Sequence, residues 1–460
     1  MQLFVLFAVL LALTYIGFSM GRRRAVAVGG NTSIGLHSLP AYHGLYVILW
    51  CGLPALAVLG LWLVFETTIV TSLVVGGLPQ DLQTLPKNEL NLLVNDIRNL
   101  AAGDATSSAA NADLKAAAAR YASLQQIGFA AMAVVCLVLA IAGIGFGRRY
   151  ITPDLRARNL VERAIMVFLV GASTIAILTT IGIVMSLLFE AWRFFQMVSP
   201  VEFLFGLEWS PQIALRDDQV ASSGSFGAVP IFAGTALISI IALCVAVPIG
   251  LFSAIYMAEY AAPKFRAVVK PLLEILAGIP TVVYGFFAAL TVAPYLRDTG
   301  IDLGLTISSE SALAAGLVMG IMIIPFVSSL SDDVITAVPR AMREGSYGLG
   351  ATKSETIRNV ILPAALPGIV GSVLLAASRA IGETMIVVMA AGLTARLTAN
   401  PFDAVTTVTV QIVTLLVGDQ EFDSPKTLAA FALGLVLFVI TLCLNVIALR
   451  VVQKYREKYD

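Results

Sequence analysis

The sequence predicts an all-α polytopic membrane protein. Of its 460 residues, 58% are hydrophobic and 13% are charged, and the mean hydropathy is +0.89. An ordinary soluble domain carries about twice that share of charged residues, so a soluble protein is excluded. Acidic and basic residues balance at 29 each, which leaves no overall basic field for nucleic acid.

Nine stretches approach the roughly 20 apolar residues that a helix needs to cross a bilayer. Eight are uncharged: 2–20, 44–65, 128–147, 164–189, 231–257, 275–296, 312–330 and 427–449. The ninth, 364–395, is apolar apart from Arg379 and Glu383. Six of the nine expected spans follow residue 160.

Basic residues in the loops predict the orientation of the chain. Most loop Lys and Arg residues share one side of the membrane when the carboxyl end is cytoplasmic, so we expect the amino terminus outside. Arg22, Arg23 and Arg24 follow the first span and no basic stretch precedes it. A cleaved signal peptide has the reverse flanks, so we expect this span to be a retained anchor.

Two segments are expected outside. Within 66–127, helical spacing of apolar residues before Gly103 predicts a helical hairpin above the membrane; no motif supports a docking role for it. The aromatic residues of 190–230 are expected chiefly to anchor helices at the headgroups, although a docking surface is an alternative. The cysteines and histidines show no metal-ligand spacing, so no metal or cofactor is expected in this chain.

The loop 338–363 carries the most specific pattern. Pro339 suits a first helical turn, and Gly350 suits a left-handed helix end. Thr352 and Glu355 form a capping-box pattern that starts a second helix, and Pro363 is expected to redirect the chain into the membrane. The loop is therefore expected to be a helix, a glycine hinge and another helix, which suits docking into a groove on a soluble partner.

This loop resembles the EAA loop of ABC importer permeases. The matching residues are Glu344, Gly345, Ser346, Gly350, Val360, Leu362 and Pro363, with Gly where the family favours Ala. The resemblance implies a coupling helix at 344–350 that fits a cleft in a nucleotide-binding ATPase subunit. The candidate coupling residues are Arg343, Glu344, Gly345, Ser346, Gly350, Leu362 and Pro363. The alternative is an ordinary surface helix.

The segment 348–354 only partly resembles a phosphate-binding loop. Thr352 stands where a P-loop has the glycine before its lysine, and no strand precedes it. With no other Walker-type motif in the chain, ATP hydrolysis is expected in a separate subunit.

Arg379 and Glu383 are charges within an expected span. Such a charge costs about 2.5–3.5 kcal/mol on insertion scales, and is rarely without function. Their separation by four residues predicts one helix face, close enough to pair. We expect Arg379 to offer an anionic substrate a stop within the pathway, with Glu383 setting its strength. The alternative is an ion pair that only fixes helix packing.

Other polar and helix-bending residues carry weaker signals. Gly278 and Pro280 predict a kinked helix lining the pathway, with close packing at Gly278, or a kink that only improves packing. Glu259 and Glu274 are expected to be solvated or to pair with Lys264 and Lys270.

From about residue 162 the chain resembles the PstC-type subunit of phosphate-uptake ABC importers. The motifs are at 205–211, 227–230, 258–263, 274–285 and 378–384. The resemblance implies a MetI-like ABC permease core of six spans in a bacterial inner membrane. It also implies a PstA-type permease, two nucleotide-binding subunits and a periplasmic phosphate-binding protein as partners.

The resemblance divides the chain into a membrane extension of about three additional N-terminal spans at 1–160 and a permease core at 161–460. An ABC permease for phosphonate, sulfate or molybdate stays possible, because one Arg does not select among oxyanions. An ion-gradient-driven secondary transporter would need coupling carboxylates in several spans and preferably inverted repeats. A membrane-embedded enzyme would need a catalytic cluster that the sequence does not show.

Overall fold

The computed structural model describes residues 2–30, 35–83, 86–103, 112–211, 224–417 and 424–455. Two compact units divide the chain at residues 178 and 179. Among the described residues, eight helices are long and apolar enough to cross a membrane, and the number is nine if one sharply bent helix pair is counted as a single span. This confirms the expected all-α polytopic fold.

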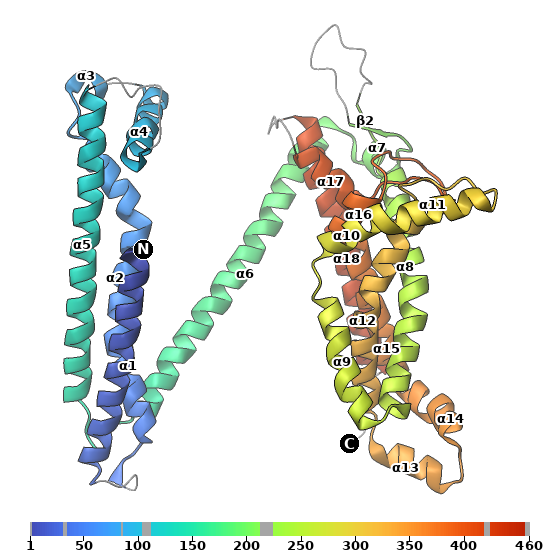
Figure 1. The fold of residues 1–460 in the computed structure, drawn as a ribbon, viewed down its shortest axis with the longest axis horizontal. Coiled ribbons are helices and arrows are strands. Elements are labelled where there is room, and N and C mark those ends of the chain that lie inside the picture. The colour runs from blue at the N-terminus through green and yellow to red at the C-terminus, as the bar shows by residue number, and fades with distance from the viewer. Residues whose placement is uncertain are drawn as a thin grey trace. The chain divides into compact units, whose positions relative to one another are not determined.

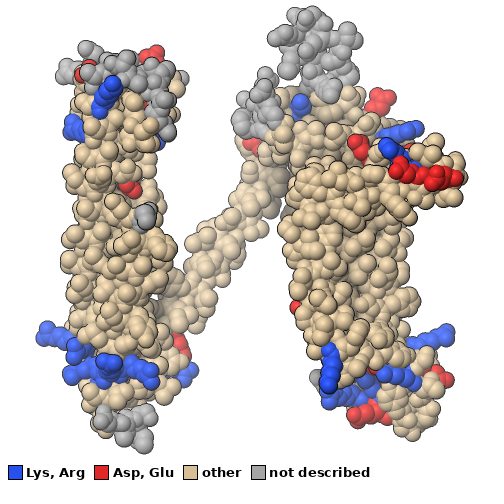
Figure 2. Space-filling model, in the orientation of Figure 1, with Lys and Arg blue, Asp and Glu red and all other residues tan. Residues whose placement is uncertain are grey.

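The first unit is built on three long helices, α1 (Gln2–Val28), α2 (Pro40–Val75) and α5 (Ala112–Arg149) (Figure 1). Small residues let these helices approach closely, as is usual in membranes. A Cβ on Gly143 of α5 would lie 2.1 Å from the Trp50 carbonyl oxygen of α2. In this unit an apolar body lies between charged ends, one of them rich in Lys and Arg (Figure 2).

The segment 66–127 consists mainly of helix. It contains the end of α2, α3 (Gln80–Gln83), α4 (Lys87–Ala102) and the start of α5. Ile97 of α4 is 1% exposed and packs with Val70 and Leu114. Gly103 ends α4 with φ 91°, as predicted. Residues 104–111, part of the predicted hairpin, lie outside the described residues, and its place above the membrane stays a prediction.

An aromatic cluster fixes the start of the second unit. It joins α6 (Ala157–Met197), α7 (Pro200–Phe205) and the two-stranded sheet of β1 (Trp209–Ser210) and β2 (Ser225–Phe226). Phe194 is fully buried and meets Phe203 and Phe226 edge to face at centroid distances of 5.1 and 5.6 Å. The expectation of interfacial anchoring is therefore wrong for these rings, because they fill a core.

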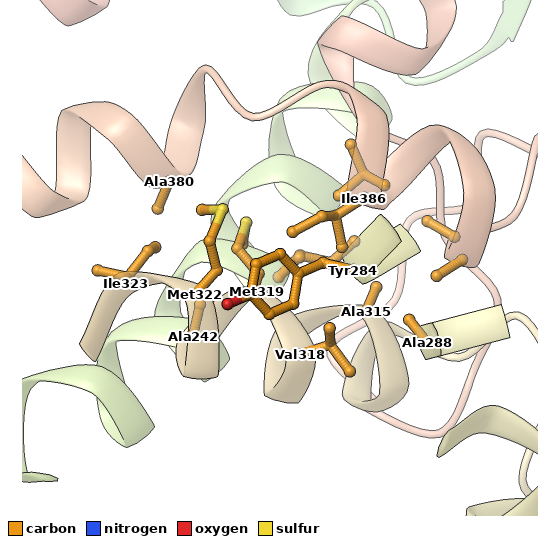
Figure 3. Close-up of a cluster of buried hydrophobic side chains, with 14 of the residues drawn as sticks. Ala242, Tyr284, Ala288, Ala315, Val318, Met319, Met322, Ile323, Ala380 and Ile386 are labelled. Atoms are coloured by element: carbon orange, nitrogen blue, oxygen red, sulfur yellow. The ribbon is translucent and has the colours of Figure 1, made fainter. Parts of the chain in front are cut away.

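Helices α8 (Val229–Ile255) and α12 (Ala312–Ala337) form the centre of the second unit. A Cβ on Gly320 would lie 2.9 Å from both the Ala242 carbonyl oxygen and Val245 Cβ, so this glycine permits the close approach. Met319, Met322 and neighbouring apolar side chains fill the space between these helices, α10 (Thr281–Phe287) and α16 (Met385–Ala390) (Figure 3).

Two predicted spans are broken helices. The kink predicted at Gly278 and Pro280 is confirmed, but it breaks the single helix expected over 275–296. Helix α9 (Pro263–Ala277) ends, and the segment of α10 (Thr281–Phe287), η3 (Ala288–Val292) and α11 (Ala293–Asp302) continues at 84°. Pro280 cannot donate to the Leu276 carbonyl, which accepts instead from the Tyr284 hydroxyl at 2.9 Å and from the Ile279 backbone N–H at 3.3 Å.

The predicted helix over 364–395 is likewise interrupted. Helix α15 (Leu362–Ile381) ends, and α16 (Met385–Ala390) begins after Thr384. The remaining elements are η2 (Tyr256–Tyr260), α13 (Arg340–Gly348), α14 (Lys353–Thr356), η4 (Ile357–Ile361), α17 (Val408–Leu416) and α18 (Pro425–Tyr455).

Candidate functional site

The loop 338–363 forms the predicted pair of short helices. Helix α13 begins after Pro339, and Gly350 follows its end with φ 86°, a conformation that favours glycine. The Thr352 hydroxyl accepts from the Glu355 backbone N–H while the Glu355 carboxylate accepts from that of Thr352, which completes the predicted capping box. These two local predictions are confirmed.

Arg343 holds α13 against the membrane-spanning helices. Its Nε donates to Glu259 Oε1 at 3.1 Å, and its Nη1 and Nη2 donate to the Val338 and Ile335 carbonyl oxygens at 2.6 Å. The side chains of Arg343 and Glu259 are 16% and 7% exposed. The expectation that Glu259 is solvated or pairs with a lysine is therefore wrong. In addition to pairing with Glu259, Arg343 donates hydrogen bonds to carbonyl oxygens at the carboxyl end of α12.

The predicted coupling residues divide between two faces of α13. Ser346 faces inward with Arg343, since its hydroxyl lies 2.8 Å from that of Thr356. Glu344 and Gly345 are exposed, and Leu349 just beyond the helix is 91% exposed. A Cβ on Gly345 would meet no described atom within 4 Å, so packing within the described chain does not require this glycine.

Leu362 and Pro363 lie inside a continuous helical run, Lys353–Ile381. The π-helical turn η4 precedes them, and the Leu362 backbone N–H donates to the Ile357 carbonyl oxygen. The expectation that Pro363 redirects the chain is wrong, because the wider turn accommodates a residue without an N–H. Leu362 packs against the apolar cluster at this end of the unit.

Arg379 lies beside a cavity of about 240 Å³ between α9, α12 and α15. The cavity is lined by Met257, Lys270, Leu273, Glu274, Ala277, Met322, Pro325, Phe326, Ser328, Ser329, Asp332 and Arg379. The Arg379 guanidinium lies over the Phe326 ring, 5.4 Å from its centroid. Although it belongs to a membrane-length helix, Arg379 is exposed within this chain.

Glu383 lies in the break between α15 and α16. Its Oε1 accepts from the backbone N–H groups of Met385 and Ile386 at 3.2 and 3.4 Å, so the carboxylate caps the start of α16. No ion pair joins Glu383 to Arg379 in the described part of the chain. The predicted shared helix face is wrong because the helix ends at Ile381.

Gly278 and Pro280 occupy the break after α9. The Gly278 N–H donates to the Glu274 and Ile275 carbonyl oxygens and thus caps α9. A Cβ on Gly278 would meet the Ile275 carbonyl oxygen at 3.3 Å, and its nearest neighbours belong to its own helix end. The expected close helix packing at Gly278 is therefore wrong. The pathway-lining role of both residues stays a prediction.

An ion cluster at one end of the cavity was missed by sequence reasoning. Asp332, whose side chain is 1% exposed, accepts from Arg266 Nη2 at 2.8 Å and from Lys270 Nζ at 2.9 Å. Lys270 also lies 3.2 Å from Asp333. The available signal was the pair Asp332 and Asp333 at the end of a largely apolar helix, because a buried carboxylate needs a cationic partner.

Two family models match separate parts of the chain. Residues 246–457 match the binding-protein-dependent transport system inner membrane component. Residues 7–179 match a family described as "Phosphate ATP-binding cassette transporter". The second match covers the extension, for which the sequence motifs gave no relative.

Curated relatives extend these matches. The probable ABC transporter permease YqgH of Bacillus subtilis is 33% identical over 63% of this chain and 87% of its own length. The phosphate transport system permease PstC of Mesorhizobium japonicum is 33% identical over 60% of this chain and 86% of its length. A solved chain of the MetNI methionine ABC transporter is 17% identical, covers 50% of this chain and 95% of that chain, and has a TM-score of 0.37. This chain belongs to the PstC family of ABC transporter permeases, which are multi-pass proteins of the inner membrane.

Proposed function

We propose that the chain is the permease subunit through which an ATP-driven importer passes phosphate across the inner membrane. The observation that carries the proposal is the anchored pair α13–α14. An exposed surface at Glu344, Gly345 and Leu349 is backed by a partly buried three-bond anchor at Arg343. A partner that pushes on this surface would move α12 and η2 with it.

The open space at Gly345 supports contact with another protein. Glycine inside a helix costs about 1 kcal/mol relative to alanine, and no described neighbour requires it here. A glycine at this position would let the backbone of a partner approach closely, which would explain why the less stable residue is present. We assign the partner as a nucleotide-binding ATPase subunit, which hydrolyses ATP while this chain holds no cofactor of its own.

Arg379 supports the route of the anion. A guanidinium exposed on a membrane-length helix needs a polar or protein neighbour, because lipid leaves its N–H groups unsatisfied. A PstA-type permease facing Arg379 would complete a pathway between the two chains. The planar guanidinium donates paired hydrogen bonds to an oxyanion. Glu383, fixed at the start of α16, adds a negative charge that sets how strongly the anion is held.

The proposed assembly has a definite orientation. A periplasmic phosphate-binding protein delivers the anion to the outer mouth, the amino terminus lies outside, and the carboxyl terminus and α13 lie in the cytoplasm. Membrane lipid covers the remaining apolar surfaces. The match of residues 7–179 to a phosphate transporter family supports phosphate over the alternatives phosphonate, sulfate and molybdate.

Co-purification followed by transport tests this proposal. The chain should be isolated from membranes with an ATPase and a second permease. In vesicles these proteins should take up phosphate only with ATP and the binding protein. Uptake that persists without the ATPase and stops with an ionophore would instead identify an ion-gradient-driven transporter. Equal ATP-dependent uptake of sulfate or molybdate would overturn the assignment of phosphate.

A further inference from the structure

The cavity beside Arg379 contains polar groups that the proposed roles leave unused. Helix α9 contributes Lys270 and Glu274 from one helical face, and α12 contributes Ser328 and Ser329. Ser328 and Ser329 lie in the half of α12 that adjoins α13, whereas Glu383 follows the opposite end of α15. The cavity therefore joins two cationic side chains, Lys270 and Arg379, with hydroxyl groups.

Ser328 is an unpartnered hydroxyl at this cavity. The residue is fully buried, and its Oγ has no hydrogen-bond partner among the residues that the structure describes. A buried hydroxyl without a partner is unfavourable, so such a group in a native protein calls for an explanation. Ser331 on the same helix is equally buried and unpartnered but does not line the cavity, which makes it a matched control.

Lys270 can leave its two carboxylate partners without leaving an unpaired buried charge, because the Asp333 side chain is 64% exposed and stays hydrated. It shares Asp332 with Arg266, whose Nη2 donates to Asp332 Oδ1 and Oδ2 at 2.9 and 2.8 Å. Asp332 thus stays neutralised when the Lys270 ammonium turns towards an anion. The lysine side chain is 30% exposed, so it is not locked by packing.

Glu274 restricts which kind of anion the cavity can bind. A carboxylate only accepts hydrogen bonds, so it repels a fully deprotonated oxyanion but can accept from one that keeps a hydroxyl proton. Monohydrogen phosphate and phosphonates carry such a proton near neutral pH, whereas sulfate does not. A site that must satisfy a polar group discriminates strongly against ligands that lack the matching group.

On the basis of the proposed function, we propose that Lys270 and Ser328 form a second anion position, past Arg379, for a protonated tetrahedral oxyanion. Ser328 donates to an anion oxygen, Lys270 moves from Asp332 to neutralise it, and Glu274 accepts its proton-bearing hydroxyl. The anion passes from Arg379 to this position before release. No covalent step is involved.

The first test compares Ser328→Ala with Ser331→Ala. Each variant removes one buried, unpartnered hydroxyl from α12, so neither loses a hydrogen bond within the chain. The maximal rate of ATP-dependent uptake of radiolabelled phosphate is measured in vesicles holding the complete transporter. We expect Ser328→Ala to be about tenfold slower or more, and Ser331→Ala to match the wild type. Equal rates for the two variants would overturn the second position.

Lys270→Gln and Lys264→Gln form the second pair, since both lysines lie on α9 and Lys264 is exposed away from the cavity. We expect a tenfold or larger loss only for Lys270→Gln, with recovery in Lys270→Arg, which keeps the charge. A loss in Lys270→Gln that Lys270→Arg does not recover would show a purely structural role and count against the proposal.

A third measurement tests the ligand class and separates this proposal from the proposed function. The complex is purified without its binding protein, and inorganic phosphate or sulfate is added before thermal unfolding. Because Arg379 can hold either anion, phosphate should raise the midpoint more than sulfate at the same concentration, and Ser328→Ala should remove this difference. Equal shifts with both anions would overturn the role of Glu274. A wild-type transporter without ATP-dependent phosphate uptake would refute the proposed function itself, whereas active uptake with an unchanged Ser328→Ala shift would refute only this site.

Discussion

Replacing Arg343 with alanine should release α13 from the membrane-spanning helices. The change removes three hydrogen bonds, two of them to carbonyl oxygens at 2.6 Å, and strands Glu259, whose side chain is 7% exposed. Removing one partner of a buried ion pair costs about 3–5 kcal/mol, because the other charge stays buried. The stability of Arg343→Lys should lie between those of the wild type and Arg343→Ala, because an ammonium keeps the charge but does not reproduce the planar fork of the guanidinium.

Arg340→Ala is the matched control, because Arg340 lies on the same helix but is exposed. Surface changes of this kind usually alter stability by about 0.5 kcal/mol or less. Denaturant unfolding of the purified variants in detergent gives the difference in free energy, and the ATP hydrolysed per phosphate transported gives the coupling. In the double variant with Glu259→Gln, part of the loss should be recovered, because the stranded carboxylate is gone. If Arg343→Ala is as mild as Arg340→Ala in both measurements, the anchor is refuted.

Four further variants test separate features. Arg379→Gln should reduce phosphate uptake about tenfold or more while the complex still co-purifies, and normal uptake would refute the pathway role. Gly345→Leu should leave unfolding unchanged, since its Cβ meets open space, yet weaken co-purification of the ATPase; full retention would contradict the contact. Gly350→Ala should cost about 1 kcal/mol at φ 86° and lower coupling, which the ATP-to-phosphate ratio measures. Tyr284→Phe should destabilise the chain by about 1 kcal/mol through the lost bond to Leu276, and an unchanged unfolding midpoint would show that the Ile279 backbone N–H alone satisfies this carbonyl.

Features set by neighbouring residues could be predicted from the sequence. The capping box of Thr352 and Glu355 and the left-handed Gly350 depend on positions within one turn, so their residue types were sufficient evidence. Eight of the nine predicted spans coincide with helices long and apolar enough to cross a bilayer, because apolar length alone decides this property. The resemblance at 344–363 predicted a helix at 344–350, which overlaps α13.

Features set by distant contacts could not be predicted. Arg343 meets Glu259 across 84 positions, and Asp332 meets Lys270 across 62, so local spacing gave no sign of either pair. The break before Glu383 also depends on a distant contact. The Glu383 backbone carbonyl accepts from the Thr409 hydroxyl of α17 at 2.8 Å, and this bond fixes the turn. The charges of Arg379 and Glu383 inside an apolar stretch showed where a special feature lies, but not which residues they contact.

The exposed guanidinium of Arg379 also bears on how many copies of the protein a cell can keep. If Arg379 faces a companion permease as proposed, a copy inserted without that permease would leave the charge without this polar neighbour, at a cost of up to about 2.5–3.5 kcal/mol where it meets hydrocarbon. Pairing would remove the cost, so surplus subunits would be the less stable ones and would be more readily removed by membrane quality-control proteases. The side chain proposed to attract cargo would in this way also keep the stoichiometry of the two permeases matched.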